Sequence, residues 1–169
     1  MRKVMMMIAA LAMSMAIEAQ TKFHDVEANE AKGAVKSMTM TMMGNTRTVN
    51  FSEDGKMSSS KMTDAVYDSN GYIQSAKVSM QGQSATAKFI WTDGRLTGQN
   101  VNAMGQDIKT TYKYDDKGVI TSVTINMGGQ EMEMPYTDYK FDDHGNWISR
   151  TTTMMGQKME TTRSFTYYE

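Results

Sequence analysis

The sequence predicts an all-β protein, an antiparallel up-and-down meander of about 11–12 strands curled strongly into an open or closed barrel-like sheet. Three observations support this fold class. A two-strand unit recurs six times between Gly33 and the C-terminus, its strands alternate apolar and polar residues, and one proline, Pro135, interrupts the chain. Because proline cannot donate to a β-ladder, its scarcity is typical of a sheet with many interior strands.

The N-terminal 32 residues precede the repeats and have a different character. Arg2 and Lys3, the apolar stretch 4–17 and Ala19 predict a signal peptide over residues 1–19. No lipobox cysteine follows it, so we expect a periplasmic, secreted or cell-surface protein without a transmembrane segment after signal removal. Residues 20–32 are predicted to be a loop or short helix that Gly33 ends, and residues 33–169 a single β-hairpin repeat domain.

Two kinds of turn separate the predicted strands. Acidic turns that follow an aromatic residue occupy residues 51–55, 67–71, 91–94, 114–118 and 141–145. Methionine-glycine turns occupy residues 43–45, 80–83, 104–106, 127–130 and 155–157. Glycine reaches positive φ without steric cost, and aspartate or asparagine bonds its own backbone, so both patterns predict hairpins. The unit from Gly55 lacks the second turn, and residues 58–61 (SSSK) are predicted to turn the chain instead.

The strands have one apolar face. Ile108, Thr110, Tyr112 and Tyr114 alternate with polar residues, and the set Val119, Thr121, Val123, Ile125 and Met127 is assigned to one face in the same way. A long sheet with one wet face must curl to cover its apolar face. Near Pro135 the apolar phase slips from even positions (132, 134, 136) to odd ones (139, 141), which predicts a β-bulge.

Composition argues against several functional classes. Cysteine is absent, and the formal net charge of -1 gives no basic face for a nucleic acid. The sequence contains no nucleophile elbow, phosphate-binding glycine loop or metalloprotease motif. We therefore expect a protein that is not an enzyme and that needs no cofactor.

Residues 114–123 (YDDKGVITSV) and 139–148 (YKFDDHGNWI) resemble the YD repeats of RHS-type proteins. Residues 33–37 (GAVKS) and the closing segment 145–169 are similar to small secreted YD-like β-hairpin proteins of Bacteroidetes. The resemblance covers nearly all of the predicted mature chain. It implies repeated hairpins in an exported, often cell-surface setting, and it assigns no catalytic residue.

Two groups of residues are candidates for binding. Alternating strand directions place the acidic turns at one end of the sheet, where Asp115, Asp116, Asp142 and Asp143 could hold calcium, although turn formation alone explains them. Methionines spaced by two share a strand face and could bind copper, line a site for an apolar ligand, or simply fill the core. The predicted ligand-binding residues are Met38, Met40, Met42, Tyr112, Val123, Met132 and Met134.

Three hypotheses for function follow from these patterns. The first is a noncatalytic exported binding or scaffold protein whose partner is an unknown protein or glycan. In the second, the protein carries a lipid-like or other apolar small molecule on the methionine- and aromatic-lined face of the curled sheet. A third hypothesis is metal binding, of copper through the methionines or of calcium through the acidic turns.

Overall fold

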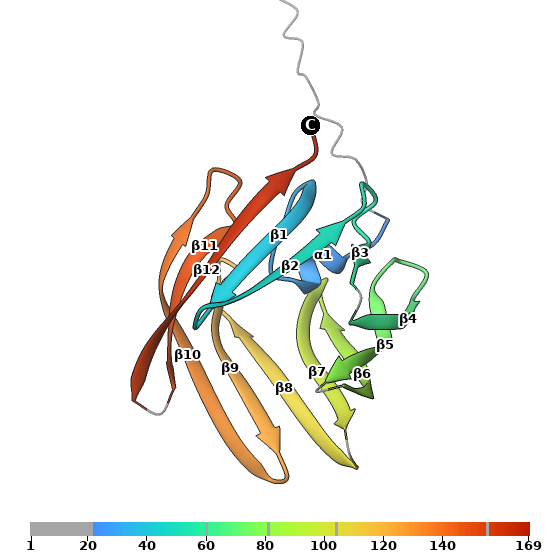
Figure 1. Ribbon diagram of the computed structural model, residues 1–169, viewed down its shortest axis with the longest axis vertical. Helices are drawn as coiled ribbons and strands as arrows, with labels where there is room; N and C mark the ends of the chain where they lie inside the picture. Colours follow the sequence, from blue (N-terminus) through green and yellow to red (C-terminus); the bar gives the residue numbers. More distant parts are fainter. Residues whose placement is uncertain (1–21, 60, 81, 104, 155) are drawn as a thin grey trace, which may run out of the picture.

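The computed structural model describes residues 22–59, 61–80, 82–103, 105–154 and 156–169 (Figure 1). The predicted signal peptide, residues 1–19, lies outside the described residues. One short helix, α1 (Asp25–Ala28), precedes twelve strands. The strands are β1 (Val35–Met42), β2 (Asn45–Phe51), β3 (Met57–Ser58), β4 (Met62–Tyr67), β5 (Ile73–Met80), β6 (Gln83–Thr92), β7 (Arg95–Ala103), β8 (Gln106–Tyr114), β9 (Ile120–Met127), β10 (Gln130–Phe141), β11 (Trp147–Met154) and β12 (Gln157–Tyr167). No helix in these ranges is long and apolar enough to cross a membrane.

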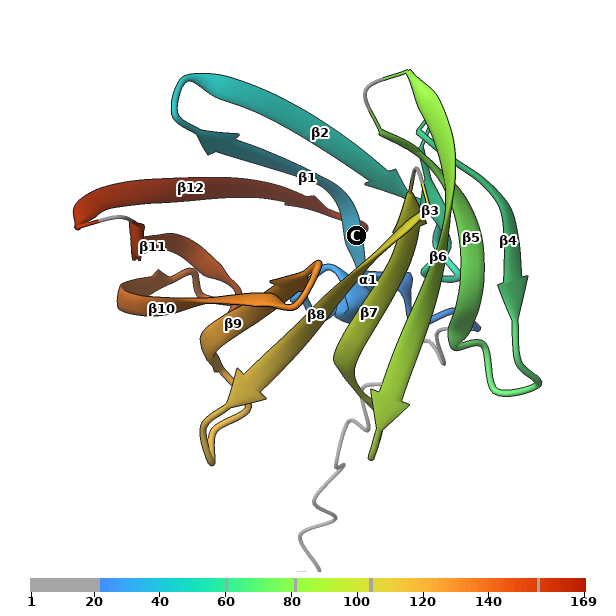
Figure 2. The ribbon, with the colours of Figure 1, turned by 90° about the horizontal axis from the view of Figure 1, so that it is seen from below.

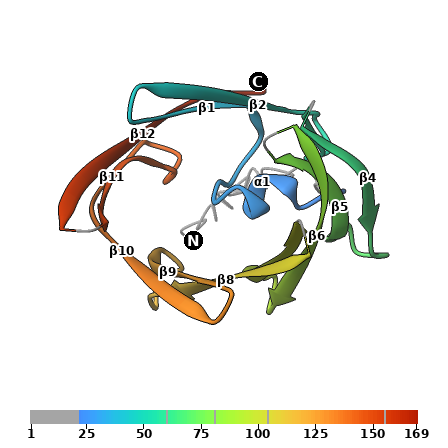
Figure 3. The ribbon, with the colours of Figure 1, turned by 60° about the horizontal axis from the view of Figure 1, so that its bottom comes forward.

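All twelve strands belong to one antiparallel sheet in the order β3-β2-β1-β12-β11-β10-β9-β8-β7-β6-β5-β4. The prediction of an all-β meander curled into a barrel-like sheet is confirmed. The first and last long strands meet, since Met38 of β1 lies opposite Phe165 of β12. Figure 3 shows the sheet as a nearly closed ring around α1. The two sheet edges are β3 and β4, and the ladder is interrupted between them.

Turn chemistry explains why the strands begin and end where they do. In the turn after β10, Asp142 Oδ1 accepts hydrogen bonds from the backbone N–H groups of His144 (3.0 Å) and Asn146 (2.8 Å). Asp68 and Asp115 make the equivalent pairs of bonds in their own turns. Between β1 and β2, Met43 and Gly44 have φ values of 50° and 75°, as a type I′ hairpin requires.

Because neighbouring strands are antiparallel, the two kinds of turn lie at opposite ends of the barrel. We call the end with the connections β2–β3, β4–β5, β6–β7, β8–β9 and β10–β11 the acidic rim. The end with the connections β1–β2, β5–β6, β7–β8, β9–β10 and β11–β12 is the methionine rim.

Bulges adjust which residues face the interior. The predicted bulge near Pro135 is confirmed by a register shift between Thr137 and Lys140, where Asp138 has a φ of 55°. A second register shift, between β8 and β9, changes which residues face inward at the start of β9. Lys113 lies opposite Ser122 and Tyr114 opposite Ile120, so Thr121 is the extra residue. Thr121 is exposed and Ile120 is buried, so the assignment of Thr121 to the same face as Val123 is wrong.

The segment before β1 covers the acidic-rim end of the barrel. The backbone N–H groups of Phe23 and His24 donate to the carbonyls of Asp54 (2.9 Å) and Gly71 (3.0 Å) in two acidic turns. Farther along, the Asn146 side chain accepts from Lys32 N (2.8 Å) and donates to Lys32 O (2.9 Å). Seen from below, α1 lies inside the curled sheet (Figure 2). The segment therefore closes one end of the barrel and places its own side chains in the interior.

Candidate functional site

The barrel interior has two parts that are filled differently. We call the part enclosed by β10, β11, β12 and β1 the packed half, and the part enclosed by β4 to β8 the hollow half. In the packed half, Trp147 is 4% exposed and contacts two arginines. The guanidinium carbon of Arg163 lies 3.5 Å from the centroid of the indole ring, and that of Arg150 lies 4.1 Å away. Large side chains thus occupy the centre of this half.

The N-terminal segment completes the packed half. The Glu30 carboxylate accepts from Arg150 Nη1 (2.5 Å) and from the Trp147 indole N–H (3.1 Å). Arg163 donates to the backbone carbonyls of Asn29 (2.8 Å), Glu30 (2.8 Å) and Trp147 (3.1 Å). Burial works against the charge of both arginines. It lowers the pKa of Arg163 to about 9, whereas the Glu30 charge outweighs it and raises the pKa of Arg150.

Sequence reasoning missed this cluster of buried charges. A signal for Arg163 was present, because it falls in phase with Thr161, Phe165 and Tyr167 on the inward face of β12. An arginine at a strand position that otherwise carries apolar residues indicates a guanidinium group that is buried and paired, not one that points into solvent. Its carboxylate partner, Glu30, is 120 residues from Arg150 in the sequence, and no local pattern connects the two.

The hollow half contains a cavity of about 430 Å³, which we call the inner cavity. Its apolar lining includes Ile73, Val78, Phe89, Leu96, Val101 and Ile108. Small buried residues lie beside this lining on the inward face, since Ala85 lies opposite Val78 and Ala87 opposite Val101. Where the packed half has tryptophan and arginine, this half has alanine, and the volume fits the range of about 300–1,000 Å³ typical of small-molecule sites.

Polar residues make up a substantial part of the lining, and they include Asn29, Ser79, Gln99 and Thr110. Asp25 of α1 is 1% exposed, and its Oδ2 accepts from the backbone N–H of Met57 (2.8 Å) and the hydroxyl of Tyr67 (2.7 Å). Its other oxygen, Oδ1, has no hydrogen-bond partner within the described residues. Burial raises the pKa of Asp25 despite those two hydrogen bonds. Arg47 and Lys61 also line the cavity, and both are exposed.

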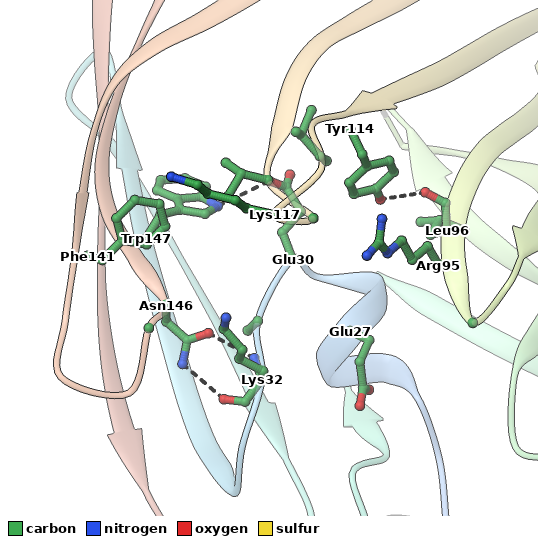
Figure 4. Close-up of a pocket in the computed structure, with 16 residues that line it drawn as sticks. Glu27, Glu30, Lys32, Arg95, Leu96, Tyr114, Lys117, Phe141, Asn146 and Trp147 are labelled. Atoms are coloured by element: carbon green, nitrogen blue, oxygen red, sulfur yellow. Dashed lines mark hydrogen bonds between the residues drawn. The ribbon is translucent and has the colours of Figure 1, made fainter.

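A second space, of about 290 Å³, lies at the acidic rim between the N-terminal segment and the turns (Figure 4). Figure 4 shows Arg95 and Tyr114 on one side of this rim cavity and Phe141 and Trp147 on the other. The Tyr114 hydroxyl donates to the carbonyl of Leu96 (2.6 Å), and burial raises the pKa of Tyr114 to about 12. The lining mixes cations with carboxylates, so no single ligand charge is favoured here.

The structure does not bring the predicted ligand-binding residues together at one site. Tyr112 lines the inner cavity and lies opposite Val123, which in turn lies opposite Met134, so these three form one row across β8, β9 and β10. Met38 and Val123 are buried in packing. Met42 and Met132 are 43% and 38% exposed. Met38, Met40 and Met42 lie on β1, and two strands separate them from Met132 and Met134 on β10.

The predicted calcium ligands lie at the acidic rim. Asp115 and Asp142 hold their own turns, as described above, and Asp142 also accepts a hydrogen bond from Tyr167 (2.5 Å). Although desolvation opposes it, hydrogen bonding keeps the pKa of Asp142 below its ordinary value. Asp116 and Asp143 are exposed. The described part of the chain contains no group of three or more His, Cys, Asp or Glu side chains placed to hold one metal ion.

Comparison of the chain with protein-family models and with curated proteins finds no match in either set. The functional interpretation therefore depends on the geometry of the interior.

Proposed function

We propose that the protein is a noncatalytic binding protein that carries an apolar small molecule in the inner cavity. The difference between the two halves supports this proposal above all. Two consecutive inward positions of β6 are alanine, and five consecutive strands contribute lining residues to one continuous space. An unfilled apolar space costs folding free energy, because the atoms around it lose contacts. A bound apolar molecule restores those contacts.

The cavity also has the character of a binding site for an apolar molecule. Aliphatic, aromatic and methionine side chains form the larger part of its walls, and polar side chains such as Asn29, Gln99 and Thr110 lie among them, a combination that holds an apolar ligand by burial of its surface and orients it by polar contacts. The walls belong to ladder-bonded strands and are therefore preformed. Together with the predicted signal peptide, this favours a carrier in the periplasm or outside the cell over the scaffold and metal-binding hypotheses.

The proposal is tested with an apolar fluorophore, 1-N-phenylnaphthylamine, titrated against the purified protein lacking residues 1–19. Thr110 lines the inner cavity, whereas the next residue, Thr111, is exposed on the outer face. We expect the wild-type protein to bind the fluorophore and Thr110→Trp to weaken binding at least tenfold, because the indole occupies the space. The matched variant Thr111→Trp should bind as the wild type does.

Equal binding by the two tryptophan variants would place the fluorophore outside the barrel and contradict the proposal. Absence of binding by the wild-type protein would contradict it too, and would return the scaffold hypothesis to first place. Thermal unfolding of both variants shows whether the barrel remains folded.

A further inference from the structure

We propose that the carried molecule is an amphiphile with an anionic head group, which Arg47 and Lys61 hold at the gap between β2 and β4. This inference rests on the proposed function and adds the chemical class of the ligand and its orientation.

The barrel wall is open between β2 and β4. Strand β3 pairs only with Asn50 and Phe51 of β2, so the part of β2 from Asn45 to Val49 has no partner on that side within the described residues. Strand β4 is the other edge of the sheet, and among the residues that the structure describes it pairs with β5 alone. The inner cavity extends to both edges, since Arg47 and Met57 line it on one side and Lys61 and Met62 on the other.

The two basic residues at this gap are available to a ligand. Arg47 lies opposite Met40, which lies opposite the buried Arg163, so Arg47 is on the inward face of β2. Lys61 immediately precedes β4. Both residues are exposed, and in the described part of the chain neither forms a salt bridge. Two uncompensated cations beside an apolar space complement an anion that is attached to an apolar chain.

The single acidic residue in the lining determines the orientation. Asp25 belongs to α1 and bonds to Met57 and Tyr67, so it lies on the acidic-rim side of the cavity. A carboxylate or phosphate placed beside Asp25 would be repelled and would lose its water. The head group therefore lies at the gap, in contact with solvent, and the apolar chain extends inward along β5 to β8.

The positive charge of Arg47 and Lys61 at the gap predicts that the protein binds anionic amphiphiles more tightly than neutral ones. Dodecanoate, dodecyl phosphate and dodecanol share a chain length and differ in the head group, so each is used to displace 1-N-phenylnaphthylamine. We expect the two anions to bind about 2- to 30-fold more tightly than dodecanol, as two exposed ion pairs allow. Added salt should reduce this preference. Whichever anion binds more tightly separates a carboxylate from a phosphate head group.

The double variant Arg47→Gln/Lys61→Gln should lower the affinity for both anions to that for dodecanol and leave dodecanol unchanged. Lys88→Gln/Lys109→Gln removes the same charge from the outer face, where both lysines lie opposite Asn100, and should keep the preference. The inference is overturned if dodecanol binds the wild-type protein as tightly as the anions do, or if the first variant weakens all three competitors equally. It is also overturned if none of the three competitors displaces the fluorophore, whereas the proposed function fails only if the wild-type protein does not bind the fluorophore in the inner cavity.

Discussion

The packed and hollow halves of the barrel are built from the same two-strand unit and differ in what their inward residues do. In the packed half, Trp147, Arg150 and Arg163 fill the interior and are held by Glu30. In the hollow half, Ala85 and Ala87 are buried on the inward face, and a cavity of about 430 Å³ lies beside them. The comparison teaches that the repeat specifies turns and ladders, whereas the size of the inward residues decides whether a segment of the barrel becomes core or site.

The N-terminal segment contributes one acidic residue to each half. Glu30 neutralises a buried arginine in the packed half, so its charge is part of the core. Asp25 bonds to two neighbours in the hollow half and keeps one oxygen without a partner among the described residues. The same segment thus stabilises one half and supplies a polar group to the cavity in the other.

The largest expected effect is on stability when the aromatic centre of the packed half is removed. Trp147→Ala should lower the free energy of unfolding by about 4 kcal/mol, because the buried indole and its contacts with two guanidinium groups are lost. Phe89→Ala in the hollow half should cost about 2 kcal/mol, since Phe89 is half-buried and already borders the cavity. Urea unfolding measures both, and equal losses would mean that the two halves are equally well packed.

A smaller effect is expected from the charge that links the N-terminal segment to the packed half. Glu30→Ala should lower the free energy of unfolding by about 3 kcal/mol, because the buried Arg150 loses its counter-ion and the Trp147 indole N–H loses its acceptor. The exposed pair of Lys113 and Glu133 is the control, and Glu133→Ala should cost at most about 1 kcal/mol. If both substitutions cost the same in urea unfolding, Glu30 is not part of the core.

The smallest effect concerns pH and the buried carboxyl of the hollow half. Burial raises the pKa of Asp25 above 3.8, so the folded protein keeps a proton that the unfolded chain has released. Its contribution to stability is therefore full below pH 3.8 and is lost as the pH rises through the folded pKa. Asp25→Asn keeps an oxygen that accepts hydrogen bonds from Met57 and Tyr67. Because an amide does not titrate, the variant does not lose stability as the pH rises through the folded pKa of Asp25. The free energy of unfolding of Asp25→Asn relative to the wild-type protein should therefore increase with pH across that window, and a difference that does not change with pH would contradict the assignment.

Local patterns predicted a large part of the fold. The hairpin turns, the one-sided strands and the bulge beyond Pro135 depend on residues adjacent in the chain, and the structure confirms them. Thr121 was misassigned because a bulge at the end of a turn depends on the register with the neighbouring strand. Of the predicted ligand-binding residues, Tyr112 lines the inner cavity, while Arg47 and Lys61 were missed because no local pattern shows which strands form the edges of the sheet. The calcium and copper hypotheses and the resemblance to YD repeats remain predictions.

By itself, the sequence determined that this chain forms a curled antiparallel meander, because φ preferences at glycine and the two-residue period of a strand act over a few neighbouring residues. Only the tertiary structure decided that β1 pairs with β12, that the wall is open between β2 and β4, and that Glu30 meets Arg150. These contacts join residues far apart in the chain, and their free energy depends on which inward side chains meet when the sheet curls. The cavity lies where five neighbouring strands curl around α1, while tryptophan meets arginine in the other half.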